Sequence, residues 1–159
     1  MSDLFKKISL TSMEDIVALS LPFLEMGKKV KFTVVGNSMH PLFCNQRDNV
    51  TVKKALKVKK RDIILYRRGD GSYVLHRVVG KGKLGFKLCG DNQIAVEYPV
   101  KQEDVVAVVT SFERKGKVYT VKNLLYKIYS FWWCSFIGLR PLGSKIVTKI
   151  HKLLNKRSR

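Results

Sequence analysis

Ser38 and His76 are the residues of this chain best suited to nucleophilic chemistry. Ser38 stands in the sequence GNSMHP (36–41), where an apolar run ends and a strand-to-turn junction can present a hydroxyl beside converging backbone N–H groups. His76 stands in VLHRVV (74–79), an alternating β-branched run that predicts a rigid strand. A serine hydroxyl needs a positioned base at neutral pH, and a histidine of ordinary pKa ~6.5 can supply one. The two motifs together predict a serine–histidine endopeptidase site.

The elements that must position these residues are short strands in the middle of the chain. Between residues 28 and 123, period-two or β-branched runs alternate with turns rich in Gly, Asp, Asn and Lys. We therefore expect a mainly β domain, a small, coiled and partly closed β-barrel, in residues 28–123. The predicted strands are 30–35, 49–52, 62–66, 73–80, 86–88, 105–112 and 117–121.

A short helix is predicted within residues 1–27. Thr11 and Ser12 are residue types that cap helix N-termini, and acidic residues follow at positions 14 and 15. Apolar residues then recur with helical spacing, with Pro22 as a point where the helix could kink, up to Gly27. We expect this helix to pack against the β domain.

The segment 124–159 has a different character from the β domain. Residues 124–139 are rich in aromatic side chains, Arg140-Pro141 interrupts them, and residues 146–154 then present a helical apolar face flanked by lysines. The segment carries 8 basic and no acidic residues. Aromatic residues beside a basic amphipathic helix are typical of helices that lie in the plane of a membrane surface. Helices packed on the barrel would show the same pattern, so both interpretations stay open here.

Charge and cysteine content narrow the class of protein further. The net charge of +19 is extreme and favours contact with nucleic acid or anionic lipid. The three cysteines (Cys44, Cys89 and Cys134) form no CxxC pair, so we expect neither a disulfide framework nor a metal site, and no cofactor. A cleavable signal peptide and a run of ~20 apolar residues that would span a bilayer are both lacking.

Residues 34–110, about half of the chain, resemble the signal peptidase I superfamily. GNSMHP (36–41) is similar to its serine motif G-x-S-M-x-P, and HRVV (76–79) to the motif of the endoplasmic-reticulum and archaeal branch, which uses histidine rather than lysine as the base. GDN (90–92) is similar to the later GDN motif. The resemblance implies a serine endopeptidase that removes signal or leader peptides from precursors.

The resemblance also implies roles for individual residues. Ser38 would be the nucleophile and His76 the general base, with Asp91 or Glu97 as the third, acidic group; these two alternatives stay open. Met39 would shape the substrate groove, and Gly36, which lacks a hydroxyl, would leave the oxyanion to backbone N–H groups near Ser38. We expect Arg77, next to the base, to be a solvated strand residue.

Two further points concern location and an alternative function. Members of the family are usually anchored by a transmembrane helix ahead of the serine motif, and no such helix is predicted here. We therefore expect a peptidase that is peripheral to an anionic membrane through its C-terminal segment, or else cytoplasmic. The alternative is a non-catalytic basic module that binds nucleic acid or anionic membrane, although no specific nucleic-acid motif is present and no specific nucleic-acid partner is expected.

Overall fold

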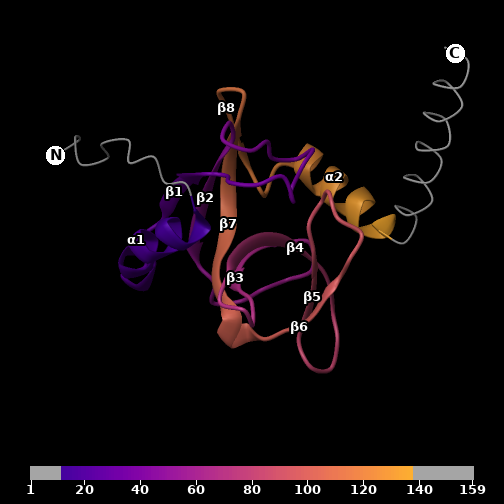
Figure 1. Ribbon diagram of the computed structural model, residues 1–159. Coiled ribbons are helices and arrows are strands. Elements are labelled where there is room, and N and C mark those ends of the chain that lie inside the picture. Colours follow the sequence, from indigo (N-terminus) through magenta and orange to yellow (C-terminus); the bar gives the residue numbers. More distant parts are fainter. Residues whose placement is uncertain (1–11, 138–159) are drawn as a thin grey trace, which may run out of the picture.

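The computed structural model describes residues 12–137, and this part of the chain is mainly β (Figure 1). Its eight strands form one antiparallel sheet, accompanied by two α-helices and a short 3-10 helix. In chain order the elements are α1 (Met13–Glu25), β1 (Val30–Thr33), β2 (Asn49–Lys54), β3 (Ile63–Arg67), β4 (Tyr73–Lys81), β5 (Phe86–Cys89), β6 (Glu97–Val100), η1 (Gln102–Asp104), β7 (Val105–Arg114), β8 (Lys117–Thr120) and α2 (Leu124–Ser135).

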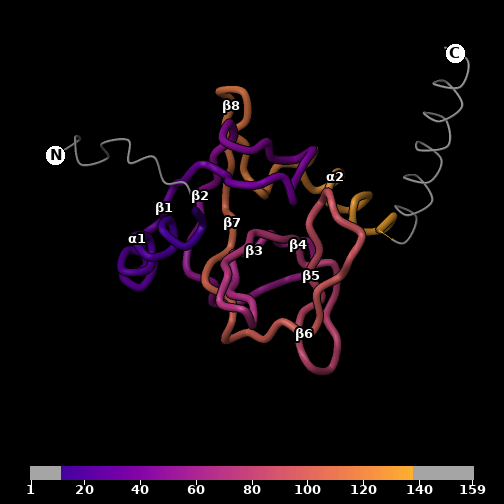
Figure 2. The backbone as a smooth tube through the Cα atoms, in the orientation of Figure 1, coloured from indigo at the N-terminus to yellow at the C-terminus, as the bar shows by residue number. Residues whose placement is uncertain are grey.

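The strand pairing leaves the sheet open. The strands are ordered β1-β2-β7-β3-β4-β5-β6, and β8 pairs with β7. β1 and β6 are the two ends of this path, so pairing within the described residues does not close the sheet. Figure 2 shows the backbone of β3 to β6 bending around a common interior. The mainly β class is therefore confirmed, whereas the strand pairing does not show the expected coiled barrel.

The strand that the sequence pattern did not predict is β6. Its four residues include Pro99, and a proline within a short run argues against a central strand. β6 pairs only with β5 and lies at the edge of the sheet, where the missing N–H of a proline is tolerated. The omission matters for the site because β6 begins with Glu97.

β4 divides its side chains between two hydrophobic cores, as the alternation of a strand requires. Leu75 belongs to the core that also contains Ile63 and Leu65 of β3. Val78 belongs to the second core, which contains Ile64 and Tyr66 of β3. His76 pairs with Ile64 and Arg77 pairs with Ile63, so these neighbouring residues project to opposite faces of the sheet.

The helix α1 covers the first of these cores. Ser12 caps it as the sequence predicted, because the Ser12 hydroxyl accepts a hydrogen bond of 3.1 Å from the Asp15 N–H. Ile16, Val17 and Leu24 lie on one face of the helix and are buried in the same core as Leu75. Pro22 lies inside the helix, which continues to Glu25.

The helix α2 covers a buried ion pair on the same face of the sheet. Arg77 donates two hydrogen bonds to the Asp91 carboxylate, of 2.8 and 2.7 Å, and both side chains are 0% exposed. From α2, the hydroxyls of Tyr126 and Ser130 accept hydrogen bonds from the Arg77 guanidinium, at 3.2 and 2.9 Å. The hydroxyl of Tyr129 donates one of 3.1 Å to Asp91. The prediction that Arg77 is solvated is therefore wrong, because α2 seals it from water.

Two sequence predictions about the C-terminal segment meet the structure differently. The first predicted helix is α2, and it packs on the sheet, as one of the two interpretations required. The second, in residues 146–154, lies outside the described residues. No helix within residues 12–137 is both long and apolar enough to cross a bilayer.

Removal of α2 tests whether this helix is part of the folded domain. A chain ending at residue 123 keeps Asp91 but loses the Tyr126 and Ser130 hydroxyls and the cover over Arg77, so its free energy of unfolding should fall by about 2–4 kcal/mol relative to the full chain. A chain ending at residue 137 keeps α2 and is the matched control, with stability close to that of the full chain. Denaturant unfolding followed by circular dichroism measures both. Equal stability of the two truncated chains would contradict this role for α2.

Candidate active site

The serine motif forms a turn that follows β1. Gly36 has a φ of +91°, in the left-handed region that favours glycine, and its N–H donates to the Asn45 side-chain oxygen at 2.9 Å. Ser38 follows as a half-buried residue in the turn. Met39, for which a groove role was expected, is 1% exposed and packs in the core that α1 covers. Its side chain therefore holds the turn on the core and does not line an open groove.

The GDN motif lies directly against this turn. The Asn92 N–H donates to the Ser38 carbonyl oxygen at 2.8 Å, and the Asn92 side chain donates to the Asn37 carbonyl at 3.3 Å. A Cβ at Gly90 would lie 2.5 Å from the Ser38 carbonyl oxygen, closer than Cβ atoms approach other atoms in proteins. Glycine is therefore required at position 90, because the serine turn approaches its Cα too closely for a side chain.

His76 is a fully buried imidazole with one satisfied ring nitrogen. Its Nδ1 lies 3.2 Å from Glu97 Oε1 and 3.2 Å from the Tyr66 hydroxyl oxygen. The Tyr66 hydroxyl donates its hydrogen to Glu97 at 2.5 Å, so both neighbours of Nδ1 present acceptor oxygens. We therefore assign the ring proton to Nδ1, which leaves the lone pair on Nε2. Nε2 is buried and has no hydrogen-bond partner among the described residues.

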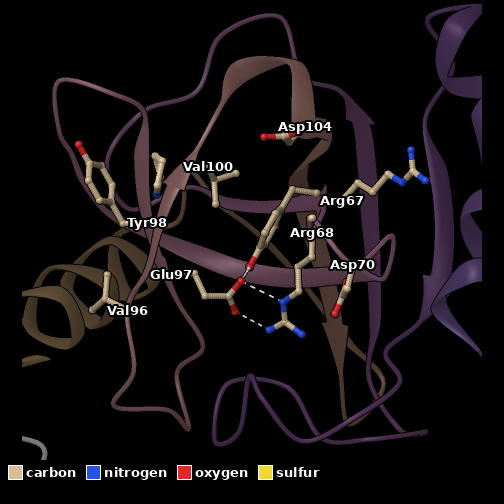
Figure 3. Close-up of a pocket in the computed structure, with 11 residues that line it drawn as sticks. Arg67, Arg68, Asp70, Val96, Glu97, Tyr98, Val100 and Asp104 are labelled. Atoms are coloured by element: carbon tan, nitrogen blue, oxygen red, sulfur yellow. Dashed lines mark hydrogen bonds and ion pairs between the residues drawn. The ribbon is translucent and has the colours of Figure 1, made fainter.

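Glu97 is held in place by two other side chains. Besides the Tyr66 hydroxyl, Arg68 contributes its Nε, at 2.9 Å from Oε2, and a further N–H bonded to Oε1. Figure 3 shows Arg68 reaching the Glu97 carboxylate. These side chains and Tyr66 line a cavity of about 470 Å³ between β6 and the turn that joins β3 to β4. Such two-pronged bonding fixes both the position and the orientation of a carboxylate.

The pKa shifts of this group follow from burial and from these bonds. Burial lowers the pKa of His76 to about 4, a fall that the nearby Glu97 carboxylate opposes only in part. Burial would raise the pKa of Glu97, but the hydrogen bonds from Arg68 and Tyr66 hold it below its ordinary value. Burial, reinforced by the bond to Glu97, raises the pKa of the Tyr66 hydroxyl. At neutral pH the group therefore contains a neutral imidazole, an ionised carboxylate and a protonated phenol.

The structure separates the two acids that the sequence left as alternatives. Glu97 contacts His76 from the edge strand β6. Asp91 instead pairs with Arg77, which points to the opposite face of β4. Burial alone would lower the pKa of Arg77, but the bonds to Asp91 raise it above its ordinary value, so the guanidinium stays charged. Of these two acids, Glu97 is the one that contacts the imidazole.

Ser38 and His76 are brought to the same region by the β4–β5 ladder. Arg77 pairs with Cys89, and because the strands are antiparallel the chain after Cys89 runs past His76. That next residue is Gly90, against which the Ser38 carbonyl rests. Gly90 therefore lies between the serine turn and the strand that carries His76. No hydrogen bond joins Ser38 to His76.

Sequence reasoning missed Tyr66 and Arg68 as members of the site. Tyr66 lies in a predicted strand, and Arg68 begins the turn after it, so both were seen only as parts of elements. Their contact with Glu97 depends on β6, which was not predicted. The available signal was the period of β3 and β4, which places Tyr66 on the same face as His76.

Comparisons with known proteins assign no family to this chain. No model of a known protein family matches the chain, and no significant match was found among curated proteins.

The two acids should respond in opposite ways to loss of charge. Asp91→Asn breaks a buried ion pair, so the free energy of unfolding should fall by about 3–5 kcal/mol. Glu97→Gln removes the carboxylate that contacts His76, so the peptide cleavage expected from the sequence should slow by about 10²–10⁴-fold with a much smaller loss of stability. Denaturant unfolding and kcat/KM measured on the same preparations check both. The exposed ion pair of Glu113 with Lys31 offers a control, Glu113→Gln, which should change neither quantity appreciably. The reverse pattern would transfer the orienting role to Asp91.

Titration of His76 tests its burial directly. Because the folded pKa is lowered from an ordinary 6.5 to about 4, the imidazole should stay neutral down to nearly pH 4. The unfolded chain takes up this proton below pH 6.5, so His76 should cost stability as the pH falls from 6.5 toward 4. NMR titration of the ring protons, assigned with a His76→Gln variant, gives the midpoint. In Glu97→Gln the midpoint should fall further, since a charge that favours imidazolium is lost. A midpoint near 6.5 would show that His76 is open to water.

Proposed function

We propose that this protein is a serine endopeptidase of signal-peptidase type, with Ser38 as nucleophile, His76 as general base and Glu97 as the acid that orients the base. The observation that carries the proposal is His76 itself, whose Nδ1 faces a fixed carboxylate while Nε2 is buried without a partner among the described residues. A buried polar atom left unsatisfied costs about 1–3 kcal/mol, so its retention favours a function for that nitrogen. A purely binding module would gain nothing from it.

The proposed reaction begins with proton transfer from Ser38 to His76. It requires Ser38 Oγ to come within about 3 Å of Nε2, a contact that often forms only when substrate binds. As Oγ attacks the scissile carbonyl carbon, Nε2 takes the hydroxyl proton and the Glu97 carboxylate stabilises the imidazolium. The imidazolium then gives this proton to the leaving amine. Water, deprotonated by the same nitrogen, hydrolyses the acyl-enzyme and regenerates Ser38.

Backbone groups of the serine turn would stabilise the oxyanion. Gly36 has no side-chain donor, as the sequence already indicated. Within residues 12–137, the N–H groups of Ser38 and Met39 make no hydrogen bond, whereas that of His40 is used by the Asn37 carbonyl at 3.1 Å. The N–H groups of Ser38 and Met39 are therefore the donors available at the nucleophile.

The fold is consistent with the same proposal. The bent, open sheet would correspond to the coiled barrel of the signal peptidase I superfamily, with β4 and β6 carrying the base and the acid. The substrate class, signal or leader peptides of precursor proteins or peptides, follows from the resemblance of the serine, histidine and GDN motifs. The groups described above need no cofactor for this hydrolysis.

Replacement of the nucleophile tests the proposal. Ser38→Ala should abolish cleavage of precursor peptides and labelling by a fluorophosphonate probe, with a change in unfolding free energy of at most about 1 kcal/mol, since only one hydroxyl is lost. Mass spectrometry of secreted and leader-bearing peptides from cells that express wild type or variant identifies the substrates. Ser135→Ala removes an exposed hydroxyl of α2 and is the matched control, which should retain both activities. Unchanged processing in Ser38→Ala would refute the peptidase proposal.

A further inference from the structure

The helix α2 presents apolar residues on two faces, only one of which is covered. The inner face docks on the sheet through the buried Tyr126, Ser130 and Cys134. The outer face contains six large apolar side chains whose exposed fractions range from 43% to 73%. They are Leu124, Leu125, Ile128, Phe131, Trp132 and Phe136. A contiguous exposed apolar patch marks a surface that binds another protein or a membrane.

The aromatic residues of the outer face already form an ordered cluster. The rings of Trp132 and Phe136 stack with centroids 5.1 Å apart, and Phe131 packs edge-on against Trp132 at 6.4 Å. Tryptophan and phenylalanine on one side of a short helix suit the boundary between lipid headgroups and acyl chains. Since α2 has 12 residues and spans roughly 18 Å, it is too short to cross a bilayer and would lie in its plane.

Charge identifies the partner of this face. Lys122, just before α2, and Lys127, within it, are both exposed. The Arg61 guanidinium lies 5.6 Å from the centre of the Phe131 ring. No acidic residue follows Glu113 anywhere in the sequence. A second copy of this chain would bring like charges together, whereas an anionic lipid surface attracts them. We propose that the outer face of α2 binds the surface of an anionic membrane, with its aromatic cluster inserted below the headgroups.

This mode of binding connects the membrane to the serine turn. Trp133 on α2 donates its indole N–H to the Asp91 carbonyl at 3.1 Å, and the neighbouring Asn92 bonds to the Ser38 carbonyl. A membrane-bound α2 therefore holds the serine turn close to the lipid surface. In a step that rests on the proposed peptidase function, the substrates would be peptides whose cleavage site emerges at that surface.

Vesicle binding tests the proposal without reference to activity. The full chain is floated with vesicles of phosphatidylcholine mixed with phosphatidylglycerol, and with pure phosphatidylcholine vesicles. We expect binding to the anionic vesicles only, with weakening at high salt. Phe131→Ser and Trp132→Ser should each weaken binding by about tenfold or more, because an aromatic side chain that would insert into the lipid is lost. Leu56→Ser removes a side chain that is 89% exposed elsewhere and is the matched control, which should bind like wild type.

Two further measurements identify the occupant of the face. Tryptophan emission should shift to the blue on addition of anionic vesicles, and this shift should be lost in Trp132→Phe, which keeps Trp133. Sedimentation should show a monomer for wild type and variants, and thermal unfolding should show that the variants are folded.

Wild-type affinity in Phe131→Ser and Trp132→Ser would overturn the proposal, since charge alone would then explain binding. Failure of the wild type to bind anionic vesicles would overturn it too, as would a dimer that these variants dissociate. A chain that binds vesicles but cleaves no peptide would keep this inference and remove only the proposed function.

Discussion

The buried ion pair of Arg77 and Asp91 is the interaction on which the rest of this structure depends. Both side chains are fully buried, a situation that is tolerated only when every polar group has partners. The sheet supplies the arginine, the GDN turn supplies the carboxylate, and α2 supplies the surrounding hydroxyls of Tyr126 and Ser130. The pair thus fixes the turn whose next residue, Asn92, bonds the Ser38 carbonyl, so the position of Ser38, the proposed nucleophile, depends on an interaction that involves neither Ser38 nor His76.

The alternation of β4 places a structural side chain, Arg77, directly after the proposed catalytic base, His76. Arg77 points to the face that α2 covers and is matched by Asp91, whereas His76 points to the other face and is matched by Glu97. The two pairs have opposite electrostatic consequences. Arg77 and Asp91 form a buried salt bridge, while burial keeps His76 neutral beside the ionised Glu97. A proton arriving on Nε2 would turn the second pair into an ion pair as well, which is the change that the proposed proton transfer would require.

The sequence predicted the elements that local periodicity determines, but not the contacts between residues far apart in the chain. The β-branched runs located β4 and β7, and Ser12 located the start of α1, because these signals are local. Spacing could not tell whether Asp91 or Glu97 meets His76, since that depends on strand β6, which Pro99 concealed. Nor could it tell that Arg77 is buried, because the covering helix lies far along the chain. An arginine beside a histidine in a strand gives no sign of which side chain faces water.

The two faces of α2 differ in composition, and each composition fits the surroundings of its face. The sequence offered packing on the domain and contact with a membrane as competing interpretations of one aromatic segment. The helix uses its hydroxyls, Tyr126 and Ser130, toward the buried ion pair, where polar groups are needed. On its outer side, Phe131, Trp132 and Phe136 remain 43–56% exposed among the described residues. A helix required only to seal Arg77 would gain stability and solubility from polar residues there. Aromatic residues on that side, with Lys127 as the one charged residue of α2, instead match the proposed binding to an anionic membrane.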